Sequence, residues 1–563
     1  MKQNLLVFDV DHIIEENMGI IRLFCKDSKG KTVLIQDKKF KPYFYVEAKD
    51  LSKYKKKLQE HDFREGKILK VETVEKQFFG EKKKLLKIIV ENPRDVYNIR
   101  NVIKTWKENK EEYEYAISFY QRYLIEKQIK PMTWTGKSKK EPKLKILAFD
   151  IEMLEQNNKE EIIMISFATN QGFKKVITTW KGKAKHTVSV DNEKTLLEKF
   201  IQIINEQDPD FIVTFNGDNF DFPKIKAAAE KHKVDIKIGR EKSNIRLVRR
   251  GRISSTKIKG RVHIDLFSFV DHILSPSMKT EVLTLDAVAE ELLGLKKRDL
   301  NWKNIKESFG SKEGLEKLSD YCLWDSELTL KLSEQLLPQV FALSELTGTI
   351  PFDAGRYMYS QLDEAYLMRQ AFKQKVLIPN NPKYDEIFKR KMKPRYTGGL
   401  VIEPEKGIHS DIIVFDFRSL YPTIIVTHNI SPDTIDCKHK ECKKNSPPEI
   451  KHHFCKKIKG FIPRNLDDII MKRTEIKNKM KKLKEDSLEH ETLDNIQYAL
   501  KIIANSIYGY MGYFGAKWYC YECAAAAAAW GRFYIKKIIE LAERFGFEIL
   551  YADTDSCFVK IKE

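Results

Sequence analysis

Several short, mostly apolar runs in this chain end at acidic residues, and this pattern does most to limit what the chain can fold into. Short runs of this kind are typical of buried strands. The runs, each with the carboxylates that follow it, are Leu144–Phe149 with Asp150, Ile412–Phe415 with Asp416, and Glu548–Tyr551 with Asp553 and Asp555. We therefore expect α/β and α+β domains that carry acidic residues at the ends of their strands.

The length of the chain calls for several domains. It has 563 residues, too many for one hydrophobic core, so roughly three to five domains are expected. A segment rich in Lys, Gly and Pro from Lys130 to Pro142 predicts one boundary, and Ile350–Pro351 predicts another. Residues 131–345 alternate strand-like and helical stretches, which predicts an α/β domain with a central sheet. Residues 1–130 predict a mixed α/β domain with strands at Leu5–Val10, Ile20–Cys25, Thr32–Ile35 and Tyr43–Val46.

The charge of the chain suggests a polyanionic partner. The formal net charge is +20, and Lys and Arg side chains that bind phosphates release condensed counterions. A general bias toward lysine explains the charge equally well, so charge alone does not decide. We expect neither a secretion signal nor a membrane span, because no apolar run is long enough.

The eight cysteines do not indicate a secreted disulfide scaffold in a chain of this size. Two pairs could form bridges, Cys442 with Cys455 and Cys520 with Cys523, although a cytosolic setting keeps thiols reduced outside hyperthermophiles. The alternative is a zinc site, which the loose spacing makes the less favoured interpretation. Its candidate ligands are Cys437, Cys442, His452, His453 and Cys455.

A first set of carboxylates predicts a hydrolytic metal site. Asp150 and Glu152 alternate along one strand, so both side chains point to the same face. Asp221 follows another strand-like run, and Asp325 lies four residues after Tyr321 on a predicted helix, which puts both on one helical face. Such oxygen ligands bind Mg²⁺ or Mn²⁺ rather than zinc. Two such ions support phosphodiester hydrolysis, and Tyr321 would orient the water.

A second set of carboxylates predicts a site for nucleotidyl transfer. Asp416 ends a strand, and Asp553 and Asp555 lie at the tip of a predicted β-hairpin. Aspartate is also a common turn former, which is the plainer explanation of the hairpin pair. Nucleotidyl transfer needs two divalent ions about 3.5–4 Å apart, and a strand end facing a hairpin tip can hold such a pair.

A helical hairpin beside this second set favours the catalytic interpretation. Helices are expected from about Leu466 to Lys484 and from about Glu489 to Ile507, with a tight turn between them. Cations on facing helices can clamp a triphosphate, whereas the run from Lys479 to Lys484 is typical of a solvated face. Arg473 and Lys477 are four residues apart on the first helix, and one face of the second helix carries Gln497, Lys501, Asn505 and Tyr508.

The first set of carboxylates resembles the proofreading exonuclease domain of family B DNA polymerases. Phe149–Glu152, Phe215–Asp221 and Tyr321–Asp325 are similar, in order, to the three motifs of that domain. The resemblance implies a ribonuclease-H-like fold and 3′→5′ exonuclease activity in residues 131–345. It also implies that Asp150, Glu152, Asp221 and Asp325 hold two Mg²⁺ ions, for which Mn²⁺ can substitute.

The second set resembles the polymerase motifs of the same family. Asp416–Thr423 resembles motif A, Lys501–Gly509 motif B and Tyr551–Ser556 motif C, and Tyr396–Gly399 resembles the motif that touches the template strand. The resemblance implies a palm of residues 346–455 and 510–563 and fingers of residues 456–509. It covers essentially the whole chain, so we expect a DNA-directed DNA polymerase with primer–template DNA and dNTPs as partners, in the cytoplasm and associated with the nucleoid.

The family resemblance also implies individual roles in the polymerase site. Asp416 and Asp555 would hold two Mg²⁺ ions, with help from Asp553 and the carbonyl of Phe417. Tyr421 would stack under the sugar and exclude a 2′-hydroxyl, and Tyr508 would pack near the nascent pair. The expected triphosphate contacts are Arg473, Lys477, Lys501, Asn505, Ser419 and Leu420, and the expected DNA contacts are Tyr396, Gly398 and Gly399.

Two segments near the N-terminus resemble the uracil-sensing pocket of archaeal members of the family. They are Phe40–Tyr45 and Asn92–Val96, in which Pro42 and Val96 match best. His12 stands where many relatives have an aromatic residue. The alternative is an ordinary N-terminal core.

Members of the family continue well past motif C into a helical thumb, whereas this sequence ends at Glu563. A second polypeptide that supplies the thumb, an intein or intron, and an incomplete gene are the competing explanations. We expect the first, with a sliding clamp reached through that partner and with an apolar face of the palm sheet partly uncovered.

Overall fold

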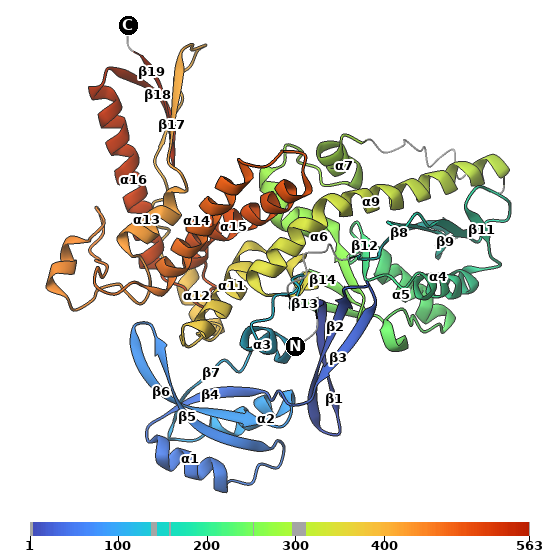
Figure 1. The fold of residues 1–563 in the computed structure, drawn as a ribbon, viewed down its shortest axis with the longest axis horizontal. Helices are drawn as coiled ribbons and strands as arrows, with labels where there is room; N and C mark the ends of the chain where they lie inside the picture. Colours follow the sequence, from blue (N-terminus) through green and yellow to red (C-terminus); the bar gives the residue numbers. More distant parts are fainter. Residues whose placement is uncertain (1–3, 137–142, 157–158, 251–252, 296–310, 562–563) are drawn as a thin grey trace. The chain divides into compact units, whose positions relative to one another are not determined.

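The computed structural model describes residues 4–136, 143–156, 159–250, 253–295 and 311–561. The chain divides into two compact units, each built from separate stretches (Figure 1). The first unit comprises Met1–Ile13, Ile20–Asp37 and Ile129–Met358, and the second comprises Ile14–Gly19, Lys38–Gln128 and Tyr359–Glu563. Residues 1–130 therefore contribute to both units.

The first unit is built on a six-stranded sheet in the order β11-β10-β9-β8-β12-β15. β8, β9 and β10 are antiparallel, while β12 runs parallel to both β8 and β15, which agrees with the predicted α/β domain with a central sheet. The strands are β8 (Ile146–Gln156), β9 (Lys159–Thr169), β10 (Lys174–Thr178), β11 (Thr187–Ser189), β12 (Phe211–Thr214) and β15 (Val262–Asp265).

Helices cover both faces of this sheet. α4 (Glu193–Gln207) and α5 (Asp221–His232) pack on the face that carries Phe149 and Ile151, where Phe149 meets Phe200 and Phe222 at 5.3 Å between ring centroids. α9 (Lys312–Thr347) packs on the opposite face of β8 and β9. Because side chains alternate along β8, Asp150 and Glu152 lie on the face covered by α9.

The rest of the first unit consists of smaller elements. β1, β2 and β3 form a three-stranded sheet, and β13 and β14 form an antiparallel pair. The four strands predicted near the N-terminus are all present, three of them in the three-stranded sheet, whereas the fourth, Tyr43–Val46, lies in the second unit. The bounds are β1 (Leu5–Glu15), β2 (Met18–Asp27), β3 (Thr32–Asp37), β13 (Arg246–Arg250), β14 (Ile253–Lys257), α6 (Leu266–Phe269), α7 (Leu285–Leu293) and α10 (Pro351–Ala354), with short helical turns η1 (Arg240–Lys242), η2 (Val270–Leu274) and η3 (Ser275–Ser277).

The second unit contains two four-stranded sheets. One has the order β5-β6-β4-β7 and buries a core of apolar residues under α1 and α2. Its elements are β4 (Tyr43–Ala48), α1 (Leu51–Glu60), β5 (Ile68–Phe78), β6 (Glu81–Val90), α2 (Pro93–Ile103), β7 (Asn109–Tyr113) and α3 (Phe119–Glu126). The other has the order β16-β18-β19-β17 and carries the polymerase motifs. Its strands are β16 (Val401–Ile402), β17 (Ile412–Asp416), β18 (Phe547–Asp553) and β19 (Ser556–Ile561).

α16 (Tyr521–Arg544) packs along the second sheet of this unit, as Figure 1 shows. Ile535 of α16 contributes to a core with Ala552 and Val559 of the sheet. β17 stays exposed along its whole length, and between 38% and 49% of each of Ile412, Ile413, Val414 and Phe415 is accessible. The other helices of this part are α11 (Tyr359–Lys373), α12 (Tyr384–Lys391) and α13 (Leu420–His428), with the turn η4 (Lys440–Lys444).

The expected helical hairpin consists of α14 (Phe461–Met480) and α15 (Leu488–Gly512), which pack against each other. The prediction placed the first helix too late, because Gly460 caps it and Pro463 lies in its first turn. The helix ends at Met480, so most of the lysine run to Lys484 lies outside it. The hydroxyl of Ser487 accepts the N–H of His490 and starts α15. In the described part of the chain no helix is both long and apolar enough to cross a membrane.

Two carboxylate centres as candidate active sites

The first centre lies between β8 and α9 of the first unit. One carboxylate oxygen each of Asp150 and Glu152 and the Sγ of Cys322 all lie within 4.8 Å of one another. The Ser166 hydroxyl on β9 contacts the carbonyl of Cys322 at 2.6 Å, which holds this turn of α9 against the sheet. The structure thus brings the two strand carboxylates next to the turn of α9 that contains Cys322.

α9 carries the other two predicted residues of this centre. Tyr321 precedes Cys322, and Asp325 lies one turn later, with 4% of its surface exposed. Burial raises the pKa of the Cys322 thiol well above its ordinary value, and the charges of Glu152, Asp150 and Asp325 raise it further. These charges act on one thiol because Asp325 lies on the same side of α9 as the two β8 carboxylates.

Asp221 is the first residue of α5 and only 3% exposed. Burial raises its pKa to about 7, and the nearby Asp265 carboxylate adds to this rise. Its Oδ1 atom is buried without a hydrogen-bond partner among the described residues. Buried carboxylate oxygens normally have donors, so an orphaned one fits a ligand to a divalent cation.

Asp265 is a buried carboxylate that the sequence reasoning missed. It accepts the backbone N–H groups of Asn216 at 2.7 Å and Asp218 at 3.2 Å, and so shapes the loop that presents Asp221. The sequence carried a signal for it, because Asp265 directly follows Val262–Ile264, a short run that is apolar except for one histidine. The same pattern pointed to Asp150 and Asp416.

The second centre lies at one end of the β16–β19 sheet. In the antiparallel register, Ser556 of β19 pairs with Asp416 of β17 on one side and with Asp553 of β18 on the other. The backbone N–H of Phe417 donates to the Asp555 carbonyl at 2.8 Å. Burial raises the pKa of Asp555, and the charges of Asp416 and Asp553 raise it further. The structure therefore brings together carboxylates that are more than a hundred residues apart in sequence.

The segment Tyr396–Gly399 reaches this carboxylate hairpin. The N–H of Thr554, between the two hairpin aspartates, donates to the Leu400 carbonyl at 2.9 Å, and Val401 pairs with Asp553. A Cβ atom on Gly399 would lie 2.5 Å from the Thr554 hydroxyl, whereas Gly398 has open space. Tyr396 packs edge-on against Tyr521 at 5.5 Å between ring centroids. A residue larger than glycine at position 399 would therefore have to displace the Thr554 side chain.

The residues predicted to contact the nucleotide lie on α13, α14 and α15. Tyr421 of α13 stacks on Tyr508 of α15 at 4.0 Å between ring centroids. Ser419 precedes α13 with a φ of +52°, so the helix N-terminus begins at Leu420. The Arg473 Nε donates to the Gln497 Oε1 at 3.1 Å and links α14 to α15. Three further predicted contacts are exposed: Lys477, Lys501 and Asn505.

The two residues matched to a uracil pocket are both buried. Val96 lies in α2 and belongs to the core of the β5-β6-β4-β7 sheet, with 6% of its surface exposed. The Pro42 carbonyl accepts the N–H of Val90 at 2.9 Å. For Val96, this placement agrees with the alternative of an ordinary N-terminal core.

Each of the two units thus holds a group of carboxylates on or next to its strands, an arrangement typical of enzymes that use divalent metal ions. The family model for DNA polymerase family B matches residues 356–563, and that for the family B exonuclease domain matches residues 135–288. The chain belongs to DNA polymerase family B and is a DNA polymerase with an exonuclease domain.

Its relatives include archaeal DNA polymerases. The chain is 40% identical to the DNA polymerase of Pyrococcus glycovorans and 38% identical to that of Thermococcus gorgonarius, in each case over 99% of this chain and 71% of the relative. Its fold is similar to that of the family B DNA polymerase from Pyrobaculum calidifontis, with a TM-score of 0.85 at 30% identity, over 99% of this chain and 74% of that one.

Proposed function

We propose that the second unit extends a DNA primer at Asp416 and Asp555 and that the first unit removes mispaired 3′ ends at Asp150, Glu152, Asp221 and Asp325. The observation that carries this proposal is the separation of the two carboxylate centres between two compact units. A stand-alone exonuclease would have no use for the Asp416–Asp555 pair.

Both centres fit divalent cations, which family B polymerases and exonuclease domains generally use. The ligand atoms are carboxylate oxygens, and one of them, the Asp221 Oδ1, is buried and has no hydrogen-bond donor among the residues that the structure describes. We propose that Asp416, Asp555 and the Phe417 carbonyl, helped by Asp553, hold two Mg²⁺ ions, and that the four exonuclease carboxylates hold two more. When bound, such ions supply activation of the attacking oxygen and neutralisation of developing phosphate charge.

The chain's own residues bind and orient the substrates. Backbone N–H groups at the start of α13, after Ser419, would donate hydrogen bonds to phosphate oxygens. Lys477 and Lys501 supply charge-assisted hydrogen bonds from the two helices of the hairpin, with Arg473 and Asn505 beside them. Tyr321 on α9 orients the water in the exonuclease centre. Tyr396, Gly398 and Gly399 position the template strand next to the aspartate hairpin.

The test is a paired assay on one labelled primer–template. With dNTPs and Mg²⁺ the primer lengthens, and without dNTPs it shortens from its 3′ end. Chelation by EDTA stops both reactions, and Mn²⁺ restores both. Degradation without any extension would contradict the proposed polymerase site, and persistence of either reaction in EDTA would contradict its metal requirement.

We further propose the domain limits 131–345 for the exonuclease, 346–455 with 510–563 for the palm, and 456–509 for the fingers. The exposed apolar residues of β17, Ile412–Phe415, support a partner surface on this sheet of the palm.

Uracil sensing at Pro42 and Val96 is a separate proposal that rests on the resemblance of Phe40–Tyr45 and Asn92–Val96. Primer extension over a template with one uracil should pause ahead of that base, while the thymine template should not. Equal read-through of both templates would contradict uracil sensing.

A further inference from the structure

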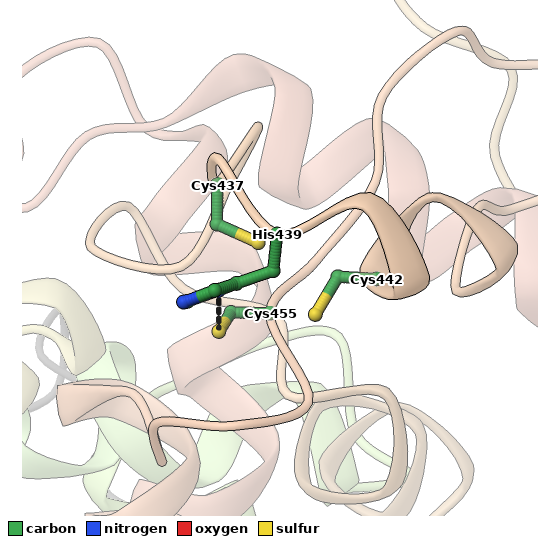
Figure 2. Close-up of side chains that lie close together, drawn as sticks. All are labelled: Cys437, His439, Cys442 and Cys455. Atoms are coloured by element: carbon green, nitrogen blue, oxygen red, sulfur yellow. Dashed lines mark hydrogen bonds between the residues drawn. The ribbon is translucent and has the colours of Figure 1, made fainter.

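Four side chains in the segment between α13 and α14 converge on one point. They are Cys437, His439, Cys442 and Cys455, and Figure 2 shows them gathered between the loop and the short turn η4. One ligand atom from each residue lies within 4.8 Å of the ligand atoms of the other three. Cys442 and Cys455 are almost fully buried, with 0% and 2% of their surfaces exposed. The polymerase and exonuclease centres use none of these residues.

The ligand set differs from the one that the sequence suggested. His452 and His453 contact Asp436 instead, at 2.7 and 3.4 Å from their Nδ1 atoms. The Nε2 of His453 also lies 2.9 Å from the Cys437 carbonyl. Both histidines are therefore engaged outside the cluster, and His439, which the sequence reasoning passed over, replaces them. Its signal was the compact spacing Cys437–His439–Cys442.

The distances within the cluster match a tetrahedral zinc site. With Zn–S bonds of about 2.3 Å and Zn–N bonds of about 2.0–2.1 Å, the S···N separation is about 3.6 Å. The Sγ of Cys455 lies 3.4 Å from the Nδ1 of His439. The backbone N–H of Lys456 donates to the Sγ of Cys442 at 3.3 Å, a contact that stabilises a thiolate. Three thiolates and one imidazole are ligands that suit zinc.

We infer that Cys437, His439, Cys442 and Cys455 bind one structural Zn²⁺ ion. The chain supplies all four ligands, which leaves no open position for a substrate and marks the site as structural. Three thiolates with Zn²⁺ carry one net negative charge. Lysines adjoin the ligands in sequence and offset this charge: Lys438, Lys440, Lys443, Lys444, Lys456 and Lys457.

The zinc site would fix the base of the α14–α15 hairpin. The N–H of Cys455 donates to the Thr434 carbonyl at 2.9 Å, and the Cys455 carbonyl accepts the side-chain amide of Asn429 at 2.5 Å. Asn429 also accepts the N–H of Gly460 at 2.8 Å, and Gly460 is the cap of α14. Two hydrogen bonds through Asn429 therefore connect Cys455 to the start of α14, the helix that carries Arg473 and Lys477.

The rival arrangement is a disulfide between Cys442 and Cys455. It would use two of the four converging side chains and leave Cys437 and His439 without a role in the cluster. Zinc uses all four, and metal binding to such a set adds directly to folding stability. The two arrangements exclude each other, because a disulfide sulfur is no longer an anionic ligand.

The test is metal analysis of the whole chain expressed with zinc in the medium. About one zinc per chain is expected in the wild type, and near-complete loss in Cys437→Ser and His439→Asn. His452→Asn and Cys520→Ser are matched controls that should keep the metal, since Cys520 lies elsewhere in the same unit as a helix cap. Cobalt added to chelator-stripped wild type should give thiolate charge-transfer absorption, and X-ray absorption at the zinc edge should show three sulfur ligands and one nitrogen.

Several outcomes would overturn the inference. One is wild-type chain that contains no zinc and gives no cobalt absorption. Others are a Cys442–Cys455 disulfide in unreduced peptides, stoichiometric iron in place of zinc, and zinc retained after Cys437→Ser and His439→Asn. Zinc lost on His452→Asn, with the chain still folded by circular dichroism, would also contradict this ligand set. The cobalt and X-ray measurements on wild type hold even if a variant fails to fold.

Discussion

The rings of Tyr421 and Tyr508 stack face to face, with centroids 4.0 Å apart and planes 12° from parallel. Tyr421 also lies near Gly531 of α16, where an added Cβ would come 3.2 Å from a carbon of its ring. The ring of Tyr421 therefore neighbours both α15 and α16. A ring packed in this way can act as a steric block beside the proposed nucleotide site.

Replacing Tyr421 should weaken discrimination against ribonucleotides. Tyr421→Ala removes the stacked ring, and we expect incorporation of rNTPs relative to dNTPs to rise about 10- to 100-fold. Tyr421→Phe keeps the ring and should behave like wild type, because the block is steric. The measurement is kcat/KM for matched rNTP and dNTP pairs. A rise in the Phe variant as large as in the Ala variant would assign discrimination to the hydroxyl instead.

Adding a methyl group at Gly399 should disable synthesis. The Cβ would lie 2.5 Å from the Thr554 hydroxyl, so Gly399→Ala must displace the Thr554 side chain, whose hydroxyl donates to the Asp553 Oδ1 at 2.8 Å. A shift of about 1 Å at a catalytic group can cost about a hundredfold in rate, and we expect that loss in single-turnover primer extension. Gly398→Ala, in open space, is the matched control. Equal rates for the two variants would show that the hairpin does not depend on this contact.

We expect only some lysines of the helical hairpin to contribute to dNTP binding. Lys477→Ala and Lys501→Ala remove proposed triphosphate contacts and should raise the KM for dNTPs by about 10- to 100-fold each, the range expected for charge-assisted hydrogen bonds. Lys479→Ala alters an exposed lysine of the same helix and should leave KM unchanged. The measurement is steady-state extension at varied dNTP concentration. A similar effect at Lys479 would indicate general charge attraction in place of defined contacts.

The first unit should lose stability as pH rises when metal is absent. The pKa of Asp221 is raised to about 7 in the folded chain, whereas its ordinary value is 3.8. Between these values the folded state holds a proton that the unfolded state has released, so unfolding free energy falls as pH rises from about 4 to 7. Above pH 7 the loss is complete.

This dependence can be measured in EDTA by hydrogen exchange in α5 and β8 at pH 5 and pH 8. Exchange rates, corrected for the intrinsic effect of pH, should show weaker protection at pH 8. Asp221→Asn cannot ionise and should remove much of the difference. Mg²⁺ should restore protection in wild type but not in the variant. A pH dependence that is identical in the two proteins would rule out Asp221 as its source.

Sequence patterns located most of the candidate site because its parts obey local rules. Alternation along β8 places Asp150 and Glu152 on one face, and the helical step from Tyr321 to Asp325 places both on α9. Both follow from backbone geometry that holds in any fold. The sequence also predicted that Asp416 and the hairpin of Asp553 belong to one site. It did not predict the strand register that brings them together.

Contacts between distant segments could not be derived from the sequence. Nothing local to Gly399 shows that Thr554 will lie against it, and nothing local to Val96 shows that α2 will bury it in a core. The prediction of the ligands of the proposed zinc site was partly wrong for the same reason. His452 and His453 are close to Cys455 in sequence, but both contact Asp436 instead. His439 takes their place among the converging side chains.

The most direct test of two separate centres is a crossed pair of variants on one primer–template. Asp555→Ala should abolish nucleotide incorporation and leave 3′→5′ degradation at the wild-type rate. Asp150→Ala should abolish degradation and leave incorporation intact. The predicted result is that each variant loses one reaction and keeps the other. Degradation that persists in Asp150→Ala, or is lost together with synthesis in Asp555→Ala, would contradict the assignment of the two reactions to the two carboxylate centres.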